Sequence, residues 1–281
     1  MPDSSTGTQR VSLRKVRSLM TGAFAALFIV TALTVVAPQA EAASRKVVIV
    51  VGPVGSSTAE YRRGANRLAR QAAGYGARVV KIYSPYATWA RVRQAASGAN
   101  VLIYLGHGNG WPSPYRPFEA SNKDGMGLNA RAGHGNSNTK YFGEAYMAKL
   151  ALAPHAVVML NRLCYASGNN EWGAGNPSLA TAIKRVDNYG AGFLRAGAQA
   201  VFASGITDVG YVLKGLFTAP KTMSMAALFW SDPSKTVKFK LGFTSKRTGG
   251  MTALMDPYAA HRYYRSVIGR LQTTVGSWRS G

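Results

Sequence analysis

The sequence AVVMLNRLCYASG, residues 156–168, is an apolar run that ends on the only cysteine of the chain, Cys164, and then turns into small residues. A second stretch, VLIYLGHGNG at residues 101–110, has the same design and ends on His107 in a glycine-rich turn. Buried parallel strands read as continuous apolar runs, and α/β folds place their sites beyond the carboxyl ends of such strands. If these two strands are neighbours, Cys164 and His107 emerge side by side as a thiol nucleophile and its base.

Around these stretches, apolar strands alternate with helical patterns. The patterns predict strands at 47–52, 77–83, 99–105, 156–163 and 198–204, and helices at 58–73, 88–97, 141–150 and 179–196. They also predict a helical region at 209–229 broken at Pro220, an edge strand at 236–243, and a long loop over the site at 109–140. The opening alternation favours right-handed crossovers and a mainly parallel sheet covered by helices on both faces.

The first 42 residues are expected to lie outside the fold. Four basic residues precede an apolar run at 19–36, and the small-x-small sequence AEA follows at 40–42. This pattern predicts a signal peptide cleaved after Ala42, and hence a secreted or cell-envelope protein without a membrane span; a retained anchor is the alternative. We expect an α/β domain at 43–242 and a C-terminal extension at 243–281 that packs on the domain or continues it.

The chain is strongly basic, with 34 Lys and Arg against 11 Asp and Glu. Four of these bases and two of these acids precede residue 43, so the remainder keeps a net charge of +21. One predicted helix, 58–73, carries a basic face. Such a surface favours anionic surroundings such as an acidic cell-envelope polymer, although no motif of a specific nucleic-acid reader is present.

Other kinds of chemistry lack a sequence signal. Four scattered histidines and one cysteine show no metal-ligand spacing, so neither a metal nor a cofactor is expected. The G-x-S-x-G elbow of serine hydrolases is absent. His134, His155 and His261 do not follow an apolar strand as His107 does, which makes His107 the candidate base. For Cys164 the alternative is a buried, inert thiol.

The order of these features resembles the caspase-like cysteine peptidases, most closely the bacterial CHAT-type and gingipain-type domains. The strand–His–Gly and strand–Cys motifs carry the likeness, together with a helix that ends in FLRAGA at residues 193–198 before the next strand. It covers residues 47–204. The resemblance implies a three-layer caspase–hemoglobinase-like α/β sandwich with a mainly parallel central sheet, and a cysteine endopeptidase that hydrolyses peptide bonds in a peptide or protein substrate.

The resemblance also implies catalytic roles. Cys164 would be the nucleophile and His107 its base, and the backbone N–H groups of Gly108 and Cys164 would form the oxyanion hole. The same logic holds physically, because a thiol needs a nearby imidazole and backbone donors must face the developing oxyanion.

Three further residues are candidates for substrate binding: Arg162, Asn161 and Asn109. In some family members the position of Arg162 helps to form the S1 pocket, and an arginine there would suit an acidic P1 side chain. The alternative is that Arg162 points elsewhere or pairs with Glu171. Asn161 and Glu171 are also candidates for orienting the site.

A second function stays open, namely a catalytically inert caspase-fold module that binds an anionic cell-wall or protein partner through its basic surface. The chain keeps both dyad residues, which favours the enzyme. Leu163 favours the module, because better-known family members carry a small residue before the cysteine, and no propeptide or activation site is evident.

Overall fold

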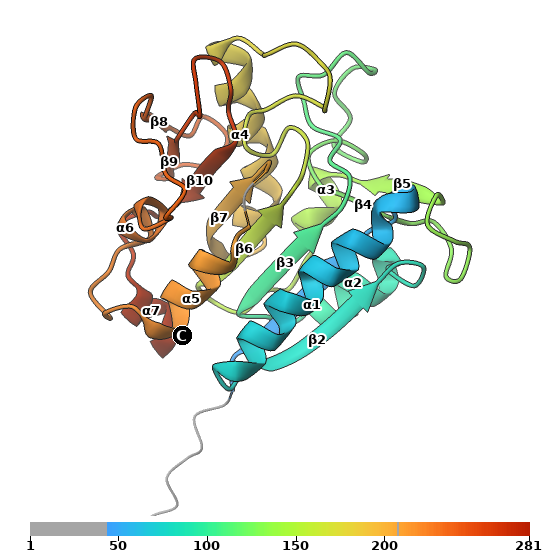
Figure 1. Ribbon diagram of the computed structural model, residues 1–281, viewed down its shortest axis with the longest axis horizontal. Helices are drawn as coiled ribbons and strands as arrows, with labels where there is room; N and C mark the ends of the chain where they lie inside the picture. Colours follow the sequence, from blue (N-terminus) through green and yellow to red (C-terminus); the bar gives the residue numbers. More distant parts are fainter. Residues whose placement is uncertain (1–43, 207) are drawn as a thin grey trace, which may run out of the picture. The chain divides into compact units, whose positions relative to one another are not determined.

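The computed structural model describes residues 44–206 and 208–281 (Figure 1). The predicted signal peptide, residues 1–42, lies outside the described residues. Within the described ranges, no helix combines the length and the apolar character that a membrane crossing requires.

An eight-stranded mixed sheet forms the centre of the fold, in the order β2-β1-β3-β6-β7-β10-β9-β8 (Figure 1). The first five strands in this order are parallel and the last three join antiparallel. Their bounds are β1 Lys46–Val51, β2 Arg78–Tyr83, β3 Val101–Leu105, β6 Ala156–Asn161, β7 Ala198–Ser204, β8 Leu241–Thr244, β9 Thr252–Met255 and β10 Arg265–Gly269.

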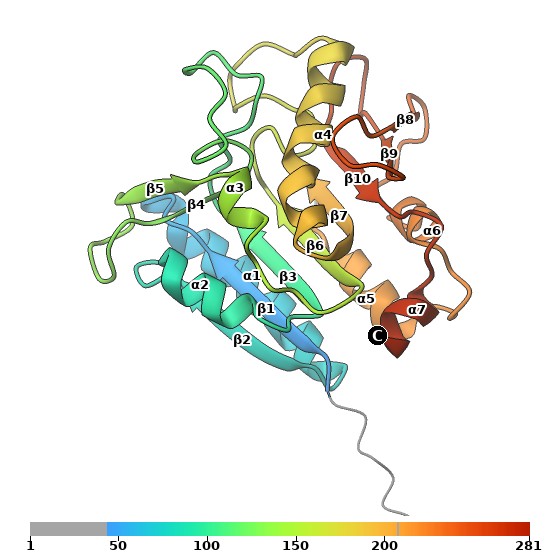
Figure 2. The ribbon, with the colours of Figure 1, turned by 180° about the vertical axis from the view of Figure 1, so that it is seen from behind.

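Helices cover both faces of this sheet, and each face has its own buried cluster (Figure 2). One face carries α2 (Trp89–Ala96), α3 (Glu144–Met147) and α4 (Leu179–Arg195). The other carries α1 (Thr58–Gly74), α5 (Gly210–Thr218), α6 (Met225–Trp230) and α7 (Val275–Ser280), while the short 3₁₀ turn η1 (Gly55–Ser57) leads into α1. Strands β3 and β6 are buried along their whole length, as their apolar sequences require. The predicted three-layer α/β architecture is therefore confirmed.

The predicted loop at 109–140 is not one long loop. It contains β4 (Met126–Asn129), which pairs antiparallel with β5 (Thr139–Phe142) in a separate two-stranded sheet. Strand β5 includes the first two residues of the range 141–150, for which a helix was predicted. Within that range only α3 is helical. Strands of only four residues show no clear period, and β4 also contains a glycine, so that tertiary contacts rather than local propensity hold this hairpin.

The final 40 residues supply β9, β10 and α7. Strand β10 pairs with β7, with Arg265 opposite Ser204 and Gly269 opposite Ala200, so the central sheet continues into this region. The edge strand predicted at 236–243 forms later in the chain, as β8, and it does lie at the edge of the sheet.

Candidate active site

The two strands that decide the fold are neighbours. Strands β3 and β6 pair in parallel, with Leu105 opposite Asn161, so both end at the same edge of the sheet. The loops that follow are in direct backbone contact, because a Cβ atom added to Gly108 would lie 2.2 Å from the carbonyl oxygen of Cys164. The segments that carry His107 and Cys164 therefore meet beyond the carboxyl ends of adjacent strands.

The backbone of His107 is held by the buried side chain of Tyr104. The Tyr104 hydroxyl lies 3.0 Å from the carbonyl oxygen of His107 and 2.8 Å from that of Gly127. The backbone N–H of Gly127 also donates to the His107 carbonyl over 3.3 Å. Because Gly127 belongs to β4, the hairpin missed in the sequence fixes the loop that carries His107.

A tight turn presents Cys164. Arg162 and Tyr165, on either side of it, have positive φ angles of 60° and 71°, a backbone region that non-glycine residues rarely adopt. The Arg162 N–H donates to the carbonyl of Ser204 over 2.7 Å, and Leu163 is buried beneath the turn. These contacts leave Cys164 half-buried at the surface of a cavity.

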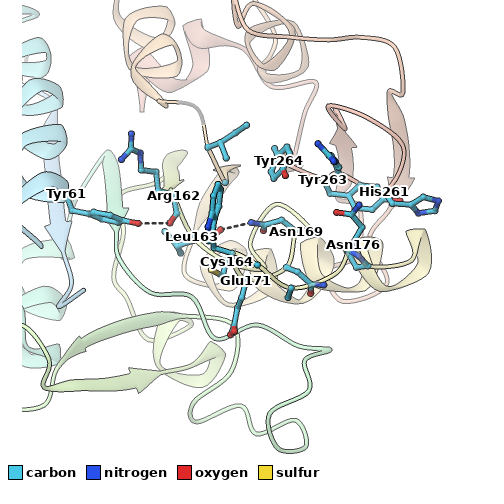
Figure 3. A pocket seen from close by; sticks show the side chains of 18 residues that line it. Tyr61, Arg162, Leu163, Cys164, Asn169, Glu171, Asn176, His261, Tyr263 and Tyr264 are labelled. Carbon is cyan, nitrogen blue, oxygen red and sulfur yellow. Dashed lines mark hydrogen bonds between the residues drawn. The ribbon is translucent and has the colours of Figure 1, made fainter. Parts of the chain in front are cut away.

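That cavity has a volume of about 500 Å³ and is shown in Figure 3. Cys164 lines it together with Glu171, the fully exposed Trp172, and Tyr264. A second cavity, of about 980 Å³, is lined by Gly108 and again by Glu171. The junction of the two loops thus lies between two cavities that share one carboxylate.

The thiol and the imidazole are both favoured in their neutral forms. Burial raises the pKa of the Cys164 thiol, and the Glu171 carboxylate adds to this, while the backbone N–H of Trp172 acts in the opposite direction. Desolvation lowers the pKa of His107, and Glu171 opposes that shift. Among the groups that shift the pKa of the thiol, the backbone N–H of Trp172 is the donor, and the His107 ring is not one of these groups.

Glu171 occupies the centre of this region. Its carboxylate accepts hydrogen bonds from the hydroxyls of Tyr165 and Tyr115, each over 2.8 Å. In the part of the chain that the structure describes, no lysine or arginine forms an ion pair with it. This carboxylate lies close enough to Cys164 to help raise the pKa of its thiol.

The candidate substrate-binding residues are placed as follows. Arg162 lines the cavity of Cys164, but its guanidinium pairs with Glu60 on α1. The alternative pairing with Glu171 is therefore wrong, whereas the alternative that Arg162 points elsewhere stays open. Asn109 lines the second cavity, and its side chain binds Lys123 and the carbonyl of Asn122, each over 2.9 Å.

Asn161 is buried, with 3% of its surface exposed, and lines neither cavity. His261 does line the cavity of Cys164, at its far end (Figure 3). Among the described residues, no group of three His, Cys, Asp or Glu side chains converges as metal ligands.

A buried carboxyl group, Asp124, supports the same loops. Its Oδ1 accepts the N–H of Trp111 over 2.9 Å, whereas its Oδ2 is buried without a partner. Burial raises the pKa of Asp124 to about 8. No sequence pattern indicates a role for this residue, because its contacts are made with Asn109 and Trp111 in the loop after His107.

We expect the titration of Asp124 to appear in the pH dependence of stability. Between about pH 4 and about pH 8 the folded chain keeps a proton that the unfolded chain has lost, so the free energy of unfolding falls as pH rises through this window. In Asp124→Asn, which stays neutral, denaturant titrations should show a flatter profile. The exposed Asp208→Asn is the control and should keep the wild-type slope; equal slopes in all three proteins would contradict the assignment.

The fold and the site define a class: an α/β protein with a free cysteine and a histidine on touching loops at one edge of its sheet. No protein-family model matches the chain, and no curated protein matches it. A solved structure is similar to it, that of a secreted C11 cysteine protease from Bacteroides thetaiotaomicron in complex with an irreversible peptide inhibitor. The identity is 10% and the TM-score 0.36, over 76% of this chain and 66% of that one.

Proposed function

We propose that the protein is a secreted caspase-like cysteine endopeptidase in which Cys164 is the nucleophile and His107 its base. One observation carries the proposal, namely the backbone contact between Gly108 and Cys164 beyond β3 and β6. This contact brings the only thiol of the chain and a histidine to one edge of the sheet, beside a cavity that Cys164 lines. Loops at such an edge, positioned by a rigid sheet, are where α/β folds build their sites.

The pKa shifts of Cys164 and His107 favour a neutral thiol and a neutral imidazole before substrate binds. In the proposed reaction, Sγ of Cys164 attacks the peptide carbonyl as its proton passes to the His107 imidazole. The protonated imidazole then gives this proton to the leaving amine, and water hydrolyses the thioester by the reverse sequence. Because the thiol pKa is raised and the imidazole pKa lowered, the proton transfer is expected to accompany substrate binding rather than precede it.

The backbone N–H groups of Gly108 and Cys164 are the proposed oxyanion donors. Among the described residues, neither group donates to a backbone acceptor. Gly108 is also a buried residue, where an acceptor supplied by a ligand would be favourable for its N–H. A developing oxyanion would be such an acceptor.

Selection of an acidic P1 residue by Arg162 is a finer proposal. Arg162 lines the cavity of Cys164, which supports it. Its exposed ion pair with Glu60 would have to give way to a substrate carboxylate, and exposed pairs of this kind are weak.

The proposed dyad predicts that the Cys164 thiol loses most of its reactivity in the variant His107→Ala. We expect labelling of Cys164 by a peptidyl electrophile, and peptide cleavage, to fall about 10² to 10⁴-fold, because the thiol loses its proton acceptor. His261→Ala is the matched control, since His261 lines the same cavity at its far end and should leave both rates unchanged. Labelling rates measured across pH, with intact protein mass as the readout, decide the matter.

Identical labelling profiles in wild type and His107→Ala would contradict the dyad. The second candidate function, an inert module that binds an anionic cell-wall or protein partner, would then lead. The raised pKa of the Cys164 thiol favours that reading, as does the net charge of +23 on the whole chain.

A further inference from the structure

Exposed basic side chains gather on three consecutive elements, α1, β2 and α2. The only acid on these elements is Glu60, which pairs with Arg162. We call the following eight exposed residues the basic edge: Arg62, Arg63, Arg67, Arg70, Arg78, Lys81, Arg91 and Arg93. These are seven arginines and one lysine, and the single acid Glu60 lies near only Arg63 and Arg67, so most of their mutual repulsion is uncompensated within these elements.

The three elements surround one margin of the central sheet. Strand β2 is the edge strand and pairs only with β1. Helices α1 and α2 cover opposite faces beside it, as the two opposed views show (Figures 1 and 2). The basic edge therefore continues from one face of the sheet, across β2, to the other face.

A cavity of about 320 Å³ lies where the three elements meet. Each contributes one cation to its lining: Arg62 from α1, Lys81 from β2 and Arg91 from α2. The remaining lining includes Tyr83 and Tyr86 but no carboxylate. Three cations from three elements around one hollow are suited to hold an anionic group.

We propose that the basic edge binds an extended polymer of phosphodiester-linked sugars or polyols, with one of its phosphates in this cavity. Arginine presents a fork of N–H donors that matches the oxygens of a phosphate group. A row of such side chains that continues around an edge fits a polymer with repeating charges better than a single small anion. Anionic ligand charge would also relieve the repulsion among the eight cations.

Two other polyanionic partners fit less well. A membrane surface calls for apolar side chains that enter the acyl region, yet Tyr86 is the only large exposed apolar residue in residues 44–114. Single-stranded nucleic acid calls for successive stacking platforms. Here the Arg91 guanidinium already lies over the Tyr86 ring, 5.5 Å from its centroid, and the Tyr83 hydroxyl is bound to Asn66.

The test measures binding of fluorescent poly(glycerol phosphate) to the full chain over a series of salt concentrations. The cavity triple variant, Arg62→Gln with Lys81→Gln and Arg91→Gln, should bind more weakly, and the slope of log Kd against log salt should fall by about one, because these three side chains together neutralise one phosphate. The control triple, Lys235→Gln with Lys238→Gln and Lys240→Gln, removes the same charge from exposed positions elsewhere and should keep the wild-type slope.

Two results would overturn the proposal. Equal losses in both triples would mean that binding follows net charge and not the basic edge. Much tighter binding of single-stranded DNA with the same number of phosphates would make nucleic acid the partner instead. None of the cavity triple lines the Cys164 cavity, so labelling of Cys164 should be unchanged in both triples, whether or not the proposed peptidase function holds.

Discussion

Replacing Gly108 by alanine should disable the candidate active site and destabilise the fold. The new Cβ atom would lie 2.2 Å from the Cys164 carbonyl oxygen, closer than real contacts allow, and 3.0 Å from the Tyr189 hydroxyl, which is tighter than most real contacts. The loops that carry His107 and Cys164 would have to separate. Overpacking of this kind costs about 1–3 kcal/mol. A displacement near 1 Å at a reacting pair lowers rates about 10²-fold.

The experiment compares Gly108→Ala with Gly175→Ala. Gly175 lies in the loop beside the same cavity, has no atom within 4 Å of an added Cβ, and does not adopt a positive φ. Denaturant unfolding and Cys164 labelling should both be impaired in the first variant and close to wild type in the second. A Gly108→Ala protein with unchanged labelling would show that the contact between the loops does not position the thiol.

The largest loss of stability is expected from Arg265→Leu. Arg265 is buried in β10, and its guanidinium forms ion pairs with Asp232 and Asp256 and donates to the Phe229 carbonyl over 2.8 Å. Its Cζ atom lies 4.6 Å from the centroid of the Phe229 ring. Removing the cation would leave two buried carboxylates without their partner, which costs about 3–5 kcal/mol.

Arg162→Met provides the contrast, because its ion pair with Glu60 is exposed and should contribute little. Urea titrations of both variants at neutral pH give the comparison. A loss of only about 1 kcal/mol in Arg265→Leu, in the range of an exposed pair, would show that the buried carboxylates find other partners or take up protons.

The sequence was most informative where strands are buried on both faces. The apolar runs before His107 and Cys164 leave few alternatives to neighbouring parallel strands, and the registers of β3 and β6 agree with this reading. Elements at the margins of the fold were harder to predict. Strand β10 has the sequence RSVIG and is fully buried. Its first residue is a charged arginine, which does not indicate a buried strand because its burial depends on two carboxylate partners elsewhere in the chain.

Contacts made across long sequence separations account for what was missed at the candidate site. Arg162 finds its partner Glu60 102 residues away, and nothing in the local sequence indicates that pairing. Tyr104 reads as one more apolar residue of its strand, although its hydroxyl links the carbonyls of His107 and Gly127. Glu171 was a candidate for orienting the site, but its position between two cavities depends on how three loops pack.

The topology of the sheet also has a consequence for how the chain folds as it is made. Strand β7 finds its outer neighbour, β10, about 60 residues later in the chain, after β8 and β9. While the ribosome synthesises that intervening segment, the buried edge of β7 has no strand beside it. Unpaired strand edges recruit other chains. A nascent chain would therefore be exposed to aggregation until β10 emerges, so that chaperone protection at this stage should govern its yield.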